Sequence, residues 1–190
     1  MYRARFGDEA PARRSVDQLR GIEGVRVRTI YQSLAQIHGI PWEGRRYDAD
    51  EWDSADIPNR AMSAGTACLY GLCEAAILAA GYAPAIGFLH RGRPLSFVYD
   101  IADLFKFDTV VPVAFGVAAR HLRGDAHGSI ERDVRIGCRD AFRKSNILDR
   151  VIPMIGELLS ASGFDPPPDA PEAPEPSFQT ETSGDDGHRG

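Results

Sequence analysis

Two aspartates and a histidine lie close together in the sequence between residues 87 and 108. Asp100 and Asp103 are three residues apart in a segment with helical apolar spacing, so their side chains are neighbours on a helix surface. His90 precedes them in a loop flanked by glycines, which can fold back over the start of the helix. Carboxylate oxygens and imidazole nitrogens are common ligands of divalent cations. The segment therefore carries the residue types of a cation site.

The same residues also have a plain structural interpretation. Pairs of aspartates on a helix usually face solvent, a single histidine is usually just hydrogen-bonded, and short motifs often match by chance. However, the neighbours of Asp100 and Asp103 are mostly apolar and leave little of the helix for solvent: Phe97, Val98, Tyr99, Ile101 and Leu104. A half-buried carboxylate needs a partner such as a cation. The spacing favours a structural role and the apolar surroundings favour a cation, so both interpretations stay open.

A predicted helix from Ser15 to Ile37 supplies a third acidic candidate. Its apolar residues return every three or four positions, and Glu23 falls among them. Gly21 and Gly24 flank this glutamate and let another backbone or a ligand approach closely. The alternative is that Glu23 lies at the edge of the apolar stripe and pairs with an arginine of the same helix.

The remaining periodic segments also predict helices, so we expect an all-α fold. Ser129 and Ser145 are candidate N-caps of the last two helices. The stretch 59–81 is apolar almost all round, which predicts a buried helix, and its polar residues argue against a membrane span. The expected helices cover residues 15–37, 59–81, 94–107, 109–121, 130–144 and 146–162, with a further short helix around Asp50–Trp52.

The expected organisation is a lead-in or linker over residues 1–14, one compact helical domain over 15–164 and a tail over 165–190. The tail is acidic and rich in proline, a composition that predicts disorder. It holds seven acidic residues and one arginine. Subtracting these from the 27 acidic and 22 basic residues of the chain leaves 20 and 21 in residues 1–164. The helical part is therefore close to neutral, and its cations are nearly all arginines. This bias fits phosphate recognition, and a GC-rich coding sequence would explain it equally well.

The chain shows no apolar signal segment at its start, so we expect a cytoplasmic protein that does not enter a membrane. Its three cysteines, Cys68, Cys73 and Cys138, are odd in number and lie in apolar or helical contexts. They predict reduced core thiols and neither a disulfide framework nor a zinc site.

Three separated blocks of the sequence resemble one known family. RRSVDQLRGIEGVRVR, SAGTACLYGLCEAAILAAGYAPAIGF and HRGRPLSFVYDIADLFKFDTVVP together look like the C-terminal helical domain of the CRISPR-associated integrase Cas1, closest to its subtype I-E branch. The resemblance covers residues 1 to about 160. Members of this family carry an N-terminal β-rich domain, and the sequence is expected to lack it because Met1 lies near the interdomain linker.

The resemblance implies a set of functional residues. A divalent cation, Mg²⁺ or Mn²⁺, is expected on Glu23, His90 and Asp103, with Asp100 as a further acidic residue beside it. The tyrosines near the active site of the family correspond to Tyr47, Tyr70 and Tyr99. The basic residues that contact DNA in the family correspond to Arg20, Arg28, Arg45, Arg93 and Arg135.

The implied function is that of a metal-dependent DNA endonuclease and integrase of CRISPR adaptation. It would join the 3′-hydroxyl of a foreign DNA fragment (a spacer) to the CRISPR repeat by transesterification, and would also cleave branched DNA. The implied partners are double-stranded DNA with 3′ ends, the Cas2 protein and a second copy of the chain in a homodimer. The alternative is a truncated, non-catalytic helical fragment of the same family that binds DNA or a protein partner. A third reading, unrelated to the resemblance, is a metal phosphohydrolase on a helical scaffold that acts on small phosphoesters.

Overall fold

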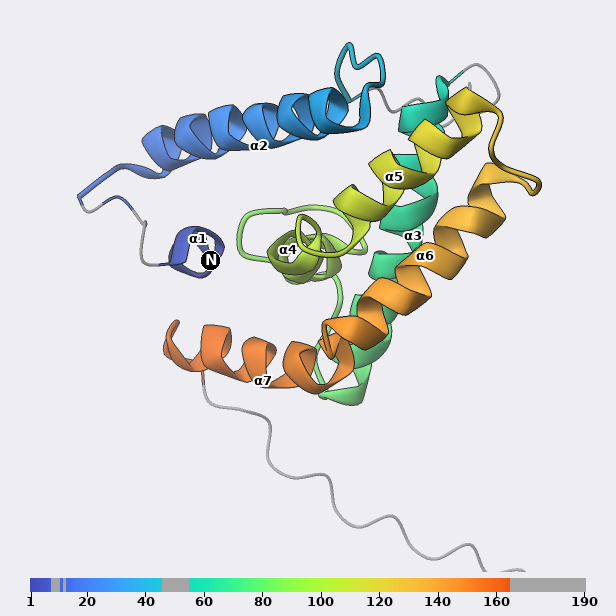
Figure 1. Cartoon of the computed structure of the whole chain (residues 1–190). Helices are drawn as coiled ribbons and strands as arrows, with labels where there is room; N and C mark the ends of the chain where they lie inside the picture. Colours follow the sequence, from blue (N-terminus) through green and yellow to red (C-terminus); the bar gives the residue numbers. More distant parts are fainter. Residues whose placement is uncertain (8–10, 12, 46–54, 165–190) are drawn as a thin grey trace, which may run out of the picture.

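The computed structural model describes residues 1–7, 11, 13–45 and 55–164. Within these ranges all regular structure is helical, which confirms the all-α expectation (Figure 1). The helices are α1 (Tyr2–Phe6), α2 (Val16–His38), α3 (Ile57–Ala79), α4 (Ser96–Phe105), α5 (Val110–Arg123), α6 (Ile130–Lys144) and α7 (Ile147–Ser160). The expected short helix around Asp50–Trp52 and the expected disordered tail lie outside the described residues.

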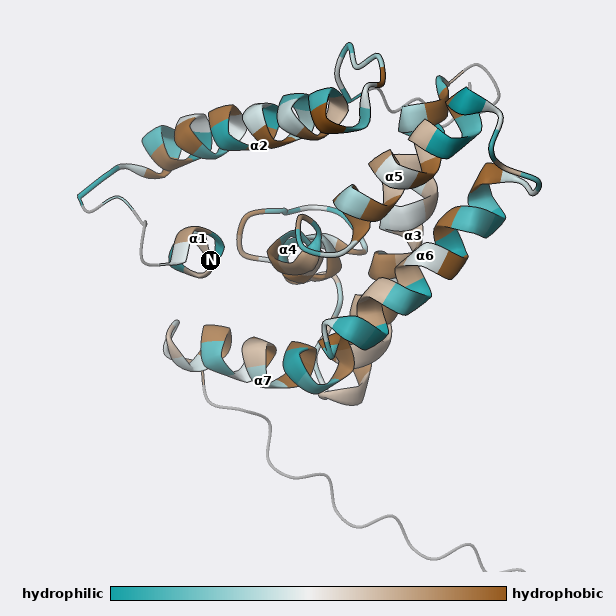
Figure 2. Cartoon of the chain, in the orientation of Figure 1, coloured by the Kyte–Doolittle hydropathy of each residue, from teal (hydrophilic) through white to brown (hydrophobic). Residues whose placement is uncertain are grey.

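Helix α3 is the centre of the bundle and packs against α4, α5, α6 and α7. Its inward face is apolar and fully buried, with Met62, Leu69 and Ile77 in the core (Figure 2). At Gly65 the neighbouring helices come so close that an added Cβ would lie 2.7 Å from Val110 Cγ1. Within the described part of the chain, α3 alone is long and apolar enough to cross a bilayer. Its central position in the core accounts for that apolar composition.

The helix ends follow the sequence signals at two of three predicted caps. Ser15 forms a capping box with Gln18 at the start of α2, and the Ser129 side chain accepts a hydrogen bond from the Arg132 N–H at the start of α6. The prediction that Ser145 caps the last helix is wrong. Its hydroxyl donates to the Phe142 carbonyl, and Asn146, in the left-handed conformation with φ 48°, makes the turn into α7 instead.

Helix α2 is less buried than its apolar spacing predicts. Tyr31 and Ala35 are its buried residues, and both lie in its C-terminal half. Tyr31 stacks on Phe115 of α5, with ring centroids 6.1 Å apart. Val16 and Ile37, at the two ends of the predicted stripe, are 54% and 75% exposed. The stripe is therefore used only along the middle and C-terminal part of the helix.

The expected lead-in contains a short helix, α1, which the composition of residues 1–14 does not indicate. Phe6 is buried, and Arg26 of α2 holds α1 in two ways. Its Nη1 donates to the Arg5 carbonyl at 2.8 Å, and its guanidinium lies 5.6 Å from the Phe6 ring centroid. Figure 1 shows α1 beside α4 and below α2. This docking brings the side chain of Arg5 into the interior.

All three cysteines are free thiols, and they differ in their ionisation. A hydrogen bond from Cys138 lowers the pKa of Cys68 to about 7, although partial burial opposes the shift. The pKa of Cys138 is raised by the same hydrogen bond, and that of Cys73 is raised to about 12 by burial. Cys68 is therefore the most acidic thiol of the chain, where α3 faces α6.

We predict that alkylation of Cys68 by iodoacetamide follows pH with a midpoint near 7, because the thiolate is the nucleophile. At neutral pH Cys73 and Cys138 should stay unmodified, as mass spectrometry of tryptic peptides can show. In the Cys138→Ala variant the midpoint should move up toward the 8.5 of an ordinary thiol. In the wild-type protein the folded-state pKa of Cys68 lies below the ordinary value for a thiol. Ionisation of Cys68 should therefore increase the free energy of unfolding as pH rises from about 7 to 9. A wild-type midpoint above 8 would contradict the prediction.

Candidate functional site

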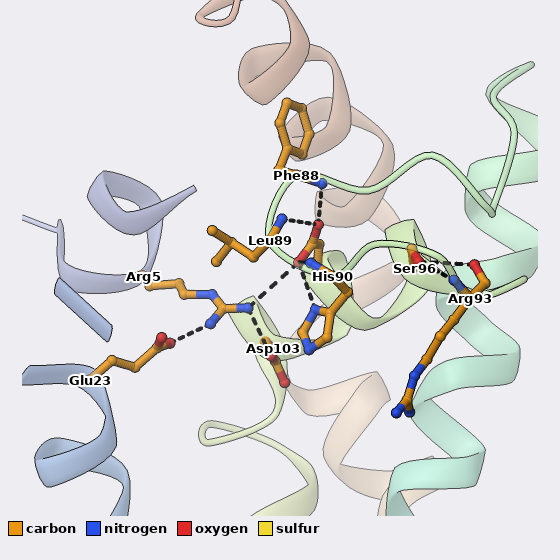
Figure 3. Close-up of polar contacts among 9 residues, drawn as sticks. Arg5, Glu23, Phe88, Leu89, His90, Arg93, Ser96 and Asp103 are labelled. Carbon is orange, nitrogen blue, oxygen red and sulfur yellow. Dashed lines mark hydrogen bonds and ion pairs between the residues drawn. The ribbon is translucent and has the colours of Figure 1, made fainter. Parts of the chain in front are cut away.

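The loop before α4 is wrapped around the side chain of Asp100, which is 0% exposed. Asp100 Oδ2 accepts hydrogen bonds from the backbone N–H groups of Phe88 and Leu89, and Oδ1 accepts one from that of His90 (Figure 3). Gly87 is packed against this turn so tightly that an added Cβ would lie 2.6 Å from the His90 carbonyl oxygen. The buried carboxylate is thus the centre around which the loop folds.

Asp100 also fixes the ring of His90. The Nδ1 atom of His90 lies 2.8 Å from Asp100 Oδ1. An ionised carboxylate only accepts hydrogen bonds, so Nδ1 carries the proton and the lone pair of the neutral ring is on Nε2. Histidine ligands of metals are commonly oriented by such a carboxylate. The histidine is therefore held in the tautomer that binds a cation through Nε2.

The other two acidic candidates are joined by an arginine that the sequence patterns did not single out. Arg5 Nη1 donates to Glu23 Oε1, and Arg5 Nη2 donates to Asp103 Oδ2 at 2.7 Å (Figure 3). The same Nη2 is 4.0 Å from Asp100 Oδ1. The Arg5 side chain is only 8% exposed. A cationic group therefore already lies between the carboxylates of α2 and α4.

Glu23, His90 and Asp103 line one pocket of about 360 Å³, together with Arg5 and Lys106. Three residues far apart in the sequence thus face a common space. Among the described residues, no group of three or more His, Cys, Asp or Glu side chains is arranged closely enough to hold a metal ion. The Arg5 guanidinium separates Glu23 from Asp103 and accounts for this spacing. Asp100 is not among the residues that line the pocket, and it contacts His90 Nδ1. It is therefore placed to orient the histidine and not to bind the cation directly.

The donor set nevertheless fits a divalent cation. Two carboxylates and an imidazole with its lone pair on Nε2 are ligands that Mg²⁺ and Mn²⁺ accept. The guanidinium of Arg5 shows that the position between Glu23 and Asp103 accepts positive charge. Lys106 lines the same pocket. Burial lowers the pKa of its ammonium group, although the negative charge of Asp103 acts to raise it.

Two of the predicted tyrosines lie beside the histidine. The rings of Tyr99 and His90 meet edge-on, with their centroids 5.5 Å apart. The ring centroids of Tyr70 and Tyr99 are 4.9 Å apart. Burial, together with the nearby Asp103 and Tyr99, raises the pKa of Tyr70 to about 12, so it stays a neutral hydrogen-bonding group. Tyr47, the third predicted tyrosine, lies outside the described residues.

The predicted DNA-contacting arginines do not all gather at this pocket. Arg20 lines it, and Arg28 and Arg93 are exposed side chains of α2 and of the loop before α4. Arg45 is bound instead to the first turns of α3, with Nη1 2.9 Å from Asn59 Oδ1 and Nη2 2.7 Å from Ser63 Oγ. Arg135 lines a different pocket, beside Cys68 and Cys138. Arg20 is thus the arginine of the predicted set that lies at the candidate site.

Comparison with known proteins gives one consistent result. The sequence profile of the family described as CRISPR associated protein Cas1 matches residues 4–139. The CRISPR-associated endonuclease Cas1 1 of Rhodospirillum rubrum is 66% identical to the chain, over all of the chain and 61% of its own length. The Cas1 endonuclease of Escherichia coli strain K12 is 55% identical over the same shares. A crystal structure of a TtCas1–DNA complex matches with a TM-score of 0.74 and 45% identity, over 83% of this chain and 56% of that one.

The chain spans about three fifths of the length of these relatives, and it corresponds to their C-terminal part. The match includes the segments that carry Glu23, His90 and Asp103, since all three lie inside the matched range. The resemblance noted in the sequence is confirmed by the profile, by the identities and by the fold. The chain therefore belongs to the CRISPR-associated Cas1 family.

Proposed function

We propose that this chain is the catalytic helical part of a divalent-metal-dependent DNA endonuclease and integrase of CRISPR adaptation. The observation that carries the proposal is the meeting of Glu23, His90 and Asp103 at one pocket, with a positive charge already held between the two carboxylates. Family membership supports the nuclease class, because the relatives are named CRISPR-associated endonucleases.

In this proposal Glu23, Asp103 and His90 Nε2 hold Mg²⁺ or Mn²⁺. The bound cation would lower the pKa of an attacking hydroxyl and offset charge on the phosphate oxygens. The residues of the chain prepare the site for that role. Asp100 keeps the proton of His90 on Nδ1, and the turn at residues 87–90, held by hydrogen bonds to the buried Asp100 carboxylate, fixes the ring in place.

Basic residues at the pocket are suited to hold the substrate backbone. Arg20 and Lys106 line the pocket with the acidic residues, and contacts from such cations to phosphate oxygens position a duplex without reading its sequence. The TtCas1 structure contains DNA, which supports DNA as the substrate class. With the 3′-hydroxyl of a spacer as nucleophile, the reaction is a transesterification onto the CRISPR repeat. With water as nucleophile it is DNA cleavage.

The proposal extends to the partners expected of the family. They are double-stranded DNA with 3′ ends, the Cas2 protein, and a second copy of the chain. We place the protein in the cytoplasm, because its three cysteines are free thiols, as is usual in that reducing compartment, and because the proposed DNA substrate lies there.

The proposal predicts that His90→Ala lowers Mn²⁺-dependent cleavage of a branched DNA duplex at least tenfold, since loss of a group that merely orients a metal ligand already costs about 10- to 100-fold. His127→Ala is the matched control, because His127 is an exposed histidine in the α5–α6 loop. Cleavage is measured from labelled strands on a denaturing gel, with EDTA as the metal-free reference. Equal rates for wild type and His90→Ala would refute the proposal. DNA binding without cleavage by the wild-type chain would favour the non-catalytic alternative.

A further inference from the structure

Arg5 takes up the acceptor groups that a cation would need. Its two terminal nitrogens are bound to Glu23 Oε1 and Asp103 Oδ2, and the second also approaches Asp100 Oδ1. A cation such as Mg²⁺ binds oxygen ligands at about 2.0–2.1 Å, well inside the contact that a guanidinium nitrogen makes. A cation placed between Glu23 and Asp103 would therefore occupy the volume that the Arg5 guanidinium fills.

Charge opposes simultaneous binding as well. The Arg5 side chain is almost fully buried, and Glu23 and Asp103 are about one fifth exposed. Like charges close together in such a partly buried site repel each other more strongly than in water. A divalent ion and a guanidinium that share the same two carboxylates thus disfavour each other.

The helix that delivers Arg5 is a small separate element. Helix α1 has five residues and is held through Phe6 and through Arg26 of α2. No other described residue places a cation between Glu23 and Asp103. The position of α1 therefore determines whether these carboxylates are paired with an internal cation.

We propose that Arg5 is an internal competitor of the metal ion, which neutralises Glu23 and Asp103 in the metal-free protein and must leave them when the ion binds. This inference rests on the metal site of the proposed function. It differs from a role in which Arg5 supports the ligands of a bound metal, because the two roles predict opposite changes in metal affinity on removal of the guanidinium.

The test is a Mn²⁺ titration of the full chain, with free Mn²⁺ followed by electron paramagnetic resonance. Arg5→Met should bind Mn²⁺ at least tenfold more tightly than wild type, equivalent to about 1.4 kcal/mol. Arg5→Lys keeps a positive charge without the planar fork and should bind with an intermediate affinity. Arg3→Met is the matched control: Arg3 is an exposed arginine of the same helix, so its loss removes one charge without opening the site.

A second measurement covers the folding of the variants. In EDTA, Arg5→Met should melt at a lower temperature than wild type, because Glu23 and Asp103 then face each other without a counter-ion. Saturating Mn²⁺ should restore its melting temperature by a larger increment than in wild type. Mn²⁺ affinity of Arg5→Met equal to or weaker than that of wild type would overturn the competitor role.

Glu23→Gln separates this inference from the proposed function. If wild type binds Mn²⁺ and Glu23→Gln binds it at least tenfold more weakly, the metal site stands and the Arg5 comparison decides the competitor role. If wild type and Glu23→Gln bind equally, or neither wild type nor Arg5→Met binds Mn²⁺, the metal site itself is refuted and the competitor role with it.

Discussion

The Asp100→Asn variant is expected to lose about 3 kcal/mol of unfolding free energy, within the range for removing one partner from a buried charged network. The carboxylate is fully buried and accepts hydrogen bonds from three successive backbone N–H groups and from the His90 ring. An asparagine side chain has one acceptor oxygen, and its NH₂ group would face N–H donors. The loop of residues 87–90 would then lose the group around which it folds. Urea unfolding followed by far-UV circular dichroism measures the change.

Asp108→Asn is the control for this prediction. Asp108 is an exposed carboxylate just after α4, so the variant removes the same charge without disturbing buried contacts and should change stability by less than about 0.5 kcal/mol. A loss below about 1 kcal/mol for Asp100→Asn would show that the loop does not depend on this carboxylate. Mn²⁺ affinity should fall along with stability, by 10- to 100-fold, because His90 loses the group that orients it.

The second large effect is expected for Gly87→Ala, a change of one methyl group. The added Cβ would lie 2.6 Å from the His90 carbonyl oxygen, 2.8 Å from Asp100 Oδ2 and 2.8 Å from the Ser96 carbonyl carbon. Two of these atoms belong to the backbone, so the clash cannot be relieved by rotating a side chain. Overpacking of this kind costs about 1–3 kcal/mol. Relief requires the His90 loop to move away from Asp100, which should lower DNA cleavage at least tenfold.

Gly71→Ala is a matched substitution with the opposite expected sign. Gly71 is an exposed residue inside α3, and its added Cβ would meet no atom within 4 Å. Replacement of a helical glycine by alanine should therefore stabilise the protein by about 0.5–1 kcal/mol and leave cleavage unchanged. Thermal melts and cleavage rates of the two variants test both statements. Equal stability of Gly87→Ala and wild type would mean that the loop accommodates the methyl group without strain.

The sequence predicted the helices better than it predicted the contacts of their polar side chains. The apolar spacing of residues 98, 102 and 105 identifies the buried face of α4, and all three are buried. Asp100 is also buried there, but spacing alone could not separate a ligand from a residue that orients one. That distinction depends on which backbone N–H groups fold over the carboxylate, which only the tertiary structure determines.

Arg5 was missed for a related reason. The first fourteen residues contain four arginines, and neither their number nor their order marks one of them as buried. The partners of Arg5 are 18 and 98 residues away along the chain, so no local pattern records the pairing. A search for buried acidic residues in excess of predicted partners could have indicated that a cation was needed, but not which one.

The exposure of α2 was misjudged because helical periodicity shows which residues share a face, and not how much of that face is covered. Val16 and Ile37 belong to the expected stripe but extend past the ends of the packed region. Arg45 illustrates the same limit for charged residues, because its bonds to Asn59 and Ser63 come from the fold and not from the composition of its loop.

The uneven anchoring of α2 has a mechanical consequence for the site. Its buried residues, Tyr31 and Ala35, lie toward one end, and Glu23 is eight residues before the first of them, about 12 Å along the axis. A tilt of about 10° around Tyr31 would carry the Glu23 carboxylate about 2 Å, roughly the length of a metal–oxygen bond. A small rotation at the anchored end of the helix would therefore change the distance between the acidic groups at the other end.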